Sequence, residues 1–275
     1  MTVIAMTREM GTLGKDVAAG VAERLGIKVV HHELVERQLA DRLKTSESAV
    51  HRFLEGEASL WERWKIDSKR LSRFSSEEVL DLAMQGNVLI RGWGAAQLLR
   101  DVSHVICVRV CAPMTHRIDE MKQRLGVDSA DIAQREIERN DDAHARAVQR
   151  QFQTDWRDPT GYNAIINTAY VPVEVAIAML QQLSKSGAYE PTDDSRADLL
   201  DKLLEARVRS TMDERLPDSP IGTGLGVTVT RGNVVINGVV SRTDSIANDI
   251  EAVKQIEGVK TVTDQTIGMT IAYGP

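Results

Sequence analysis

Cysteine, basic runs and long apolar runs are all scarce in this sequence. Its 275 residues include 2 cysteines, Cys107 and Cys111, which lie in one apolar run. Such a pair is more typical of buried free thiols in a reducing compartment than of a disulfide or a metal pair. No stretch approaches the roughly 20 apolar residues that a membrane helix needs, and the opening apolar run is interrupted by Arg and Glu, unlike a secretion signal. We therefore expect a cytoplasmic protein with no transmembrane segment.

The overall charge is acidic. The formal net charge is −6, the sequence pI is about 5.6, and no run of Lys and Arg is present. A general binder of nucleic acid or of an anionic membrane needs such a run to release counterions, so neither class is expected, although local Arg clusters can still bind small phosphates. Hydrophobic residues make up 42% and charged residues 27%, which is typical of globular proteins. At this length we expect two domains, each with its own core.

The first part of the chain alternates predicted strands and helices. Apolar runs that predict strands lie at residues 3–6, 88–90, 104–110 and 164–166. The segments between them carry apolar residues at helical spacing, as in residues 17–25. This alternation predicts a parallel sheet covered by helices on both faces. Residues 33–84 contain no convincing strand, and we interpret them as a helical insert anchored by Trp61, Trp64 and Phe74.

The pattern changes after a closing helix at residues 173–183, which begins behind Pro172. A segment rich in Ser, Gly, Pro and Asp follows, and we interpret it as a linker. The expected division is a first domain of residues 1–184, a linker of residues 185–196 and a second domain of residues 197–275. The second domain is predicted to have the order αββαβ, with helices near 197–212 and 243–256 and strands at 227–230, 234–237 and 259–267.

A glycine turn between the first strand and the first helix carries the clearest chemical signal. In Gly11-Thr-Leu-Gly14-Lys15, the backbone N–H groups and the positive helix end would converge on a phosphate, and Lys15 would add a mobile charge. Of the full phosphate-loop pattern G-x-x-x-x-G-K-[ST], only Gly14-Lys15 match, because Glu9 replaces the first Gly and Asp16 the hydroxyl residue. The alternative is a tight turn that needs glycine for its geometry alone.

Several motifs in order make residues 1–183 resemble the cytidylate kinase-like family. They are Thr7-Arg-Glu-Met-Gly-Thr-Leu-Gly-Lys15, Gly92-Trp-Gly-Ala95, Ala112-Pro113 before Arg117, Asp155-Trp-Arg-Asp-Pro159, Tyr162 and Ile165-Ile-Asn-Thr168. The resemblance implies a P-loop nucleoside monophosphate kinase fold, with a parallel sheet flanked by helices and a lid that carries arginines. It also implies ATP and Mg²⁺ as cofactors and phosphoryl transfer as the chemistry, which is mainly positioning and charge neutralisation.

The same resemblance implies roles for individual residues. The cofactor-binding residues would be Gly11, Thr12, Gly14, Lys15 and Asp16, of which the first four would line the donor phosphates. The catalytic cations would be Lys15, together with Arg117 at the base of the lid and Arg146 and Arg150 in it. Because Arg146 and Arg150 are four residues apart, a helix would place both on one face. The alternative for these two arginines is a solvated helix face shared with Glu136 and Glu138.

The sequence also departs from the family pattern at several charged positions. His31 stands where the family has an acidic residue, Trp93 where it has Arg, and Leu13 where it has Gly. The segment Asp142-Ala-His144 stands where further lid arginines are usual. His31 and His32 suggest a metal pair, but neighbouring side chains on an extended chain point apart, so we favour a loop or helix-cap position.

Residues 198–271 resemble the BON module. The motif Val227-Thr-Val-Thr-Arg-Gly-Asn-Val-Val-Ile-Asn-Gly-Val-Val240 and the later Gly258-Val-Lys-Thr-Val262 carry the resemblance. It implies a smaller α+β binding module for a protein or lipid-related ligand, and this part of the chain offers no nucleophile or acid–base pair. We predict ATP-dependent phosphoryl transfer to a small acceptor, most simply a pyrimidine nucleoside monophosphate. The alternative is a catalytically weak nucleotide-binding sensor that acts through its BON module, and a homo-oligomer is left open in both cases.

Overall fold

The computed structural model describes residues 1–31, 40, 46, 48, 68–92, 94–215, 225–240 and 243–268. The chain divides into two compact units, one formed by Met1–Leu71 with Gln85–Thr192 and the other by Ser72–Met84 with Asp193–Pro275. The predictions made for His32, Trp61, Trp64 and Trp93 lie outside the described residues.

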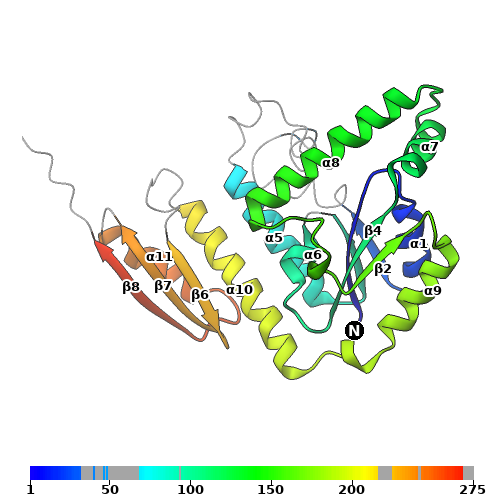
Figure 1. Ribbon diagram of the computed structural model, residues 1–275. Coiled ribbons are helices and arrows are strands. Elements are labelled where there is room, and N and C mark those ends of the chain that lie inside the picture. Colours follow the sequence, from blue (N-terminus) through cyan, green and yellow to red (C-terminus); the bar gives the residue numbers. More distant parts are fainter. Residues whose placement is uncertain are drawn as a thin grey trace, which may run out of the picture. The chain divides into compact units, whose positions relative to one another are not determined.

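The first unit is built around a five-stranded parallel sheet in the order β2-β3-β1-β4-β5 (Figure 1). Its strands are β1 (Val3–Arg8), β2 (Lys28–His31), β3 (Val88–Arg91), β4 (Val105–Cys111) and β5 (Ala164–Asn167). The inner strands β1 and β4 are almost continuously buried, as strands covered on both faces should be. The predicted parallel sheet is therefore confirmed.

Strand β2 is the one strand of this sheet that the sequence did not predict. It lies at the edge of the sheet, and Val30 is its only fully buried residue. Four residues with a single buried side chain give no recognisable period. Because His31 is the last residue of β2, the predicted loop or helix-cap position of His31 is wrong.

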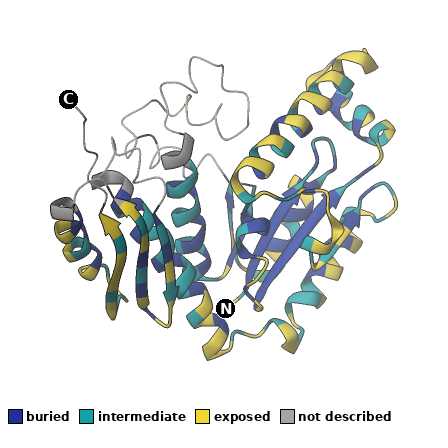
Figure 2. Cartoon of the chain, turned by 60° about the vertical axis from the view of Figure 1, so that its left-hand side comes forward, coloured by how far each residue is buried: buried dark blue, intermediate teal, exposed yellow. Residues whose placement is uncertain are grey.

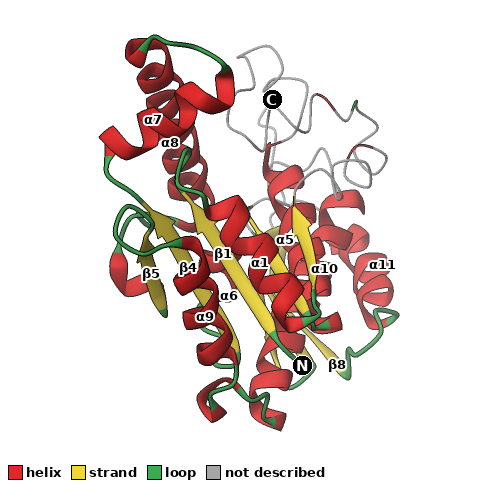
Figure 3. Ribbon diagram, turned by 90° about the vertical axis from the view of Figure 1, so that its right-hand side faces the viewer, coloured by secondary structure: helices red, strands yellow, loops and turns green. Residues whose placement is uncertain are grey.

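Helices cover both faces of the sheet. The helices that lie wholly in this unit are α1 (Gly14–Leu25), α6 (Ala95–Leu99), α7 (Met114–Leu125), α8 (Ala130–Phe152) and α9 (Val173–Ser184). Helix α5 (Ser68–Gln85) begins and ends in this unit, but its residues Ser72–Met84 belong to the second unit. Helices α1 and α9 lie on one face and α6 on the other, while α7 and α8 extend beyond the carboxyl ends of β1 and β4 (Figure 3). Burial follows the same plan, with dark strands inside and a largely exposed α8 (Figure 2).

The face of α1 explains how closely it packs on α9. Val17, Ala18 and Val21 are fully buried in the main core with Ile177 of α9. A Cβ at Gly20 would come within 2.2 Å of the Ile177 side chain, so a glycine lets the two helices approach. This packing holds the start of α1 at the carboxyl edge of β1.

The second unit has the predicted order αββαβ. Its elements are α10 (Asp193–Arg215), β6 (Gly226–Thr230), β7 (Asn233–Val240), α11 (Thr243–Lys254) and β8 (Thr261–Gly268). The sheet order is β6-β7-β8, antiparallel between β6 and β7 and parallel between β7 and β8. Arg231 and Gly232 both have positive φ, 50° and 80°, which suits a two-residue hairpin turn. The core of this unit includes Val208, Val234, Ile236 and Val253.

The segment predicted as a linker contains regular structure. A short 3-10 helix covers Gly187–Tyr189, and α10 begins at Asp193, four residues before the expected start at residue 197. The second unit also includes Ser72–Met84 of α5, and Arg207 of α10 contacts Asp81 at 2.6 Å. The domain boundaries at 184 and 197 therefore stay a prediction.

Candidate functional site

The loop between β1 and α1 has the backbone geometry of an anion site. Gly11 and Leu13 have φ values of 78° and 54°, and Leu13 takes up this left-handed conformation although it is not a glycine. Among the described residues, no acceptor meets the backbone N–H groups of residues 10–15, whereas the next two N–H groups donate to the Leu13 carbonyl. These open donors lie at the positive end of α1, where a phosphate would be stabilised.

The hydroxyl groups of two threonines, one in the loop and one after β5, fix the backbone of the loop. The Thr12 hydroxyl donates to the Glu9 carbonyl at 2.7 Å, and the Thr168 hydroxyl donates to the Thr12 carbonyl at 2.8 Å. Thr12 is 1% exposed, and Gly14 approaches Arg8 so closely that a Cβ there would lie 2.9 Å from the Arg8 Cβ. The glycine at this position therefore serves close packing, and Thr12 contributes to the loop through its hydroxyl.

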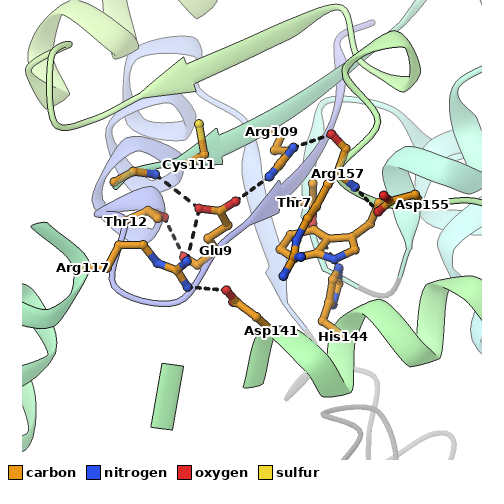
Figure 4. Close-up of polar contacts among 12 residues, drawn as sticks. Thr7, Glu9, Thr12, Arg109, Cys111, Arg117, Asp141, His144, Asp155 and Arg157 are labelled. Carbon is orange, nitrogen blue, oxygen red and sulfur yellow. Dashed lines mark hydrogen bonds and ion pairs between the residues drawn. The ribbon is translucent and has the colours of Figure 1, made fainter. Parts of the chain in front are cut away.

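Glu9, which replaces the first glycine of the phosphate-loop pattern, is the centre of a buried ion cluster (Figure 4). Its carboxylate accepts from Arg109 of β4 and lies 3.4 Å from Nη1 of Arg117. The side chain is only 10% exposed. A bare carboxylate here would repel phosphate, but two guanidinium groups neutralise it.

Arg117, predicted to act at the base of the lid, is the second centre of this cluster. Its side chain is 5% exposed, and it donates to the Met10 carbonyl and to Asp141 of α8, both at 2.7 Å. Burial raises the pKa of the Asp141 carboxyl, and the hydrogen bond and charge of Arg117 oppose that rise. Arg117 therefore ties α7 and α8 to the loop, and its predicted direct action on a phosphoryl group stays a prediction.

The other predicted site residues are exposed. Lys15 and Asp16 lie in the first turn of α1, and Arg146 and Arg150 lie on the outer part of α8. The Arg150 side chain donates to the Arg146 carbonyl at 3.1 Å. Glu136 and Glu138 of the same helix contact Arg139 and Gln134 instead. The two arginines thus lie on one helix, α8, as predicted, and their role in a lid stays a prediction.

A second group around Trp156 was not predicted. Trp156 is 1% exposed, and the His144 ring meets it edge-on with centroids 4.5 Å apart. His144 Nε2 lies 3.4 Å from the Thr7 hydroxyl at the end of β1. The guanidinium groups of Arg109 and Arg157 lie over the indole, at 5.1 and 5.7 Å from its centroid. This group joins the segment after α8 to the cluster of Glu9.

Metal binding and membrane crossing can be examined only for the described part of the chain. There, no group of three or more His, Cys, Asp or Glu side chains is arranged to hold a metal ion. No helix in the described segments has the length and apolar composition needed to cross a bilayer. The open N–H donors of the loop suit an anionic group such as a phosphate.

Comparison with known proteins agrees with this geometry. Residues 3–170, more than half of the chain, match the model of the cytidylate kinase-like family, and residues 201–267 match the BON domain. The chain therefore belongs to the cytidylate kinase-like family and carries a BON domain C-terminal to its kinase-like unit. A cytidylate kinase of Pyrobaculum aerophilum is 24% identical over 177 residues, which cover 64% of this chain and 89% of the relative.

Solved structures support the fold assignment. An uncharacterized protein from Eubacterium ventriosum superposes with a TM-score of 0.52 at 19% identity, covering 68% of this chain and 99% of that protein. A shikimate kinase from Bacteroides thetaiotaomicron is similar at a TM-score of 0.41 and 16% identity, covering 67% of this chain and 99% of that one. The fold is a kinase-like parallel sheet flanked by helices, with a small separate mixed sheet.

Proposed function

We propose that the protein catalyses ATP-dependent phosphoryl transfer to a small acceptor, most simply a pyrimidine nucleoside monophosphate. The observation that carries the proposal is the loop of residues 10–15, with open N–H donors at the start of α1. Gly11, Thr12 and Gly14 would shape this loop around the donor phosphates, and Lys15 would neutralise their charge. The neutralised Glu9 makes the loop compatible with an anion although the first glycine is missing.

In the proposed reaction the bond between the terminal phosphorus of ATP and its bridging oxygen breaks, and the bridging oxygen of ADP keeps the bonding electrons. A new bond forms between that phosphorus and an oxygen of the acceptor. Mg²⁺ carried with ATP would neutralise phosphate charge, and Asp16, in the first turn of α1, would help to hold it. Arg146 and Arg150, exposed on α8, would approach the transferred group from the lid side. The BON domain would regulate the kinase-like unit or bind a partner.

A second candidate is a nucleotide-binding sensor with little or no turnover. The observation that favours it is that Arg117, the arginine expected at the base of the lid, is buried and paired with Glu9 and Asp141. The segment Asp142-Ala-His144 supplies no arginine either. Both candidates share nucleotide binding at the loop and differ in whether charge is neutralised in the transition state.

The test is ATP consumption with Mg²⁺ across a panel of nucleoside monophosphates, with ATP affinity measured in parallel. Turnover with one pyrimidine monophosphate well above the rate without acceptor supports the kinase. ATP binding without turnover on any acceptor supports the sensor, and absence of ATP binding rejects both candidates.

A further inference from the structure

Arg157 is an arginine whose backbone is fixed by the same cluster that holds the loop. Its carbonyl accepts from Nη1 of Arg109 at 2.8 Å, and its N–H donates to the Asp155 carboxylate at 2.8 Å (Figure 4). The other terminal nitrogen of Arg109 donates to Glu9 at the start of the loop. One guanidinium group therefore positions both the loop and the backbone of Arg157.

The Arg157 side chain is also oriented, and among the described residues its charge has no ion-pair partner. Its guanidinium carbon lies 5.7 Å from the ring centroid of the buried Trp156, so stacking limits the side chain to the indole side. Within the described segments, no carboxylate forms an ion pair with Arg157, whereas Arg109 and Arg117 are both paired with Glu9. Arg157 is exposed, and its charge still acts on Asp141 in the cluster.

We propose that Arg157 contacts the terminal phosphate of the nucleotide held by the loop, and so supplies the lid charge that the buried Arg117 does not. This inference rests on the proposed function. Arg157 follows α8 in the chain, and its backbone is tied to Glu9 at the start of the loop through Arg109. Its guanidinium lies over Trp156 and acts on Asp141 of the buried cluster, and an oriented guanidinium without an ion-pair partner can form a bidentate phosphate contact.

The substitution Arg157→Gln tests this contact cleanly, because both fixed hydrogen bonds of residue 157 involve its backbone and survive the change. We expect the dissociation constant for ATP to rise about tenfold and that for ADP to change less than about twofold, since ADP lacks the contacted phosphate. Any turnover should fall about tenfold or more. Arg157→Lys, which keeps the charge without the planar fork, should lie between Arg157→Gln and the wild type.

The matched control is Arg139→Gln, which removes an exposed arginine of α8 that pairs with Glu136. It should leave both nucleotide affinities and turnover unchanged. If the wild type binds ATP and Arg157→Gln keeps the wild-type ratio of ATP to ADP affinity, the assignment of Arg157 is overturned while the proposed function stands. If the wild type binds neither nucleotide, the proposed function fails and the inference fails with it.

Discussion

The two units use charge in opposite ways. In the kinase-like unit, Glu9, Arg117 and Asp141 form ion pairs with side chains that are only 5 to 10% exposed. In the second unit, Arg231 of the hairpin turn pairs with Asp194 and Asp198 of α10, and these side chains are 45 to 88% exposed. Buried charges are tolerated only when every partner is present, whereas exposed pairs contribute little. The buried ion pairs of the kinase-like unit therefore hold the candidate anion site in place, whereas the exposed pairs of the second unit only support a turn at its surface.

The largest expected effect comes from breaking the buried cluster. Arg117→Met should lower the free energy of unfolding of the kinase-like unit by about 3–5 kcal/mol, because Glu9 loses a counter-charge and Asp141 loses its partner. Urea unfolding of the purified variant measures the loss. The control Arg139→Met removes an exposed pair with Glu136 and should cost less than about 1 kcal/mol. Equal losses in the two variants would contradict the contrast between buried and exposed charge.

A smaller effect is expected for the charge at the open side of the loop. Lys15→Ala should weaken ATP binding by roughly ten- to a hundredfold, because one charge-assisted contact is lost. Isothermal titration of the variant and the wild type with ATP and Mg²⁺ checks this value. Lys28→Ala, an exposed lysine at the start of β2, is the matched control and should bind as the wild type does. Unchanged affinity of Lys15→Ala would reject both functional candidates.

The exposed network of the second unit should respond much less. Arg231→Ala removes the contacts to Asp194 and Asp198 but keeps the two backbone N–H bonds of the turn to Asp201. Its cost in unfolding free energy should stay below about 1 kcal/mol and shrink further at high salt. Thermal unfolding at low and high salt measures both statements. A loss as large as that of Arg117→Met would show that exposure does not separate the two networks.

The smallest expected effect is in the thiols, which report on the first unit alone. Burial raises the pKa of Cys107 to about 12, so at pH 8 only about one thiol in ten thousand is ionised and able to react. Iodoacetamide should therefore leave Cys107 unmodified until the kinase-like unit unfolds, as peptide mass analysis along a urea series would show. The Cys111→Ser variant removes the half-exposed second thiol as a competing signal. Rapid modification of Cys107 in the native protein would argue against its burial.

The sequence predicted the elements of both units because their apolar periods are local. The runs at Val3 and Val105 appear as buried strands where they were expected, and the alternation at Val227 appears as a partly exposed strand. Strand β2 was missed because its four residues carry one fully buried side chain. The grouping of Ser72–Met84 with the second unit was also missed, since it depends on contacts far along the chain, such as Arg207 with Asp81.

The site was only half visible in the sequence for the same reason. The loop was found because its glycines and Lys15 are adjacent in the chain. One of the two partners that neutralise Glu9 is Arg109, 100 residues away, and no local pattern connects them. Glu9 itself gave a signal, as a carboxylate in the position of a glycine, and a buried Arg such as Arg109 would have been the expected counter-charge. Trp156 and Arg157 lay within a family motif that carried no assigned role.

The threonine contacts beneath the loop have a consequence for how fast and how tightly a ligand is captured. With Thr12 bonded to Glu9 and Thr168 bonded to Thr12, the loop already has its ligand-ready conformation before any nucleotide arrives. These two bonds reduce the conformational entropy that the loop would lose on binding a phosphate. Under the proposed function, ordering of this loop would therefore not limit the capture of a nucleotide.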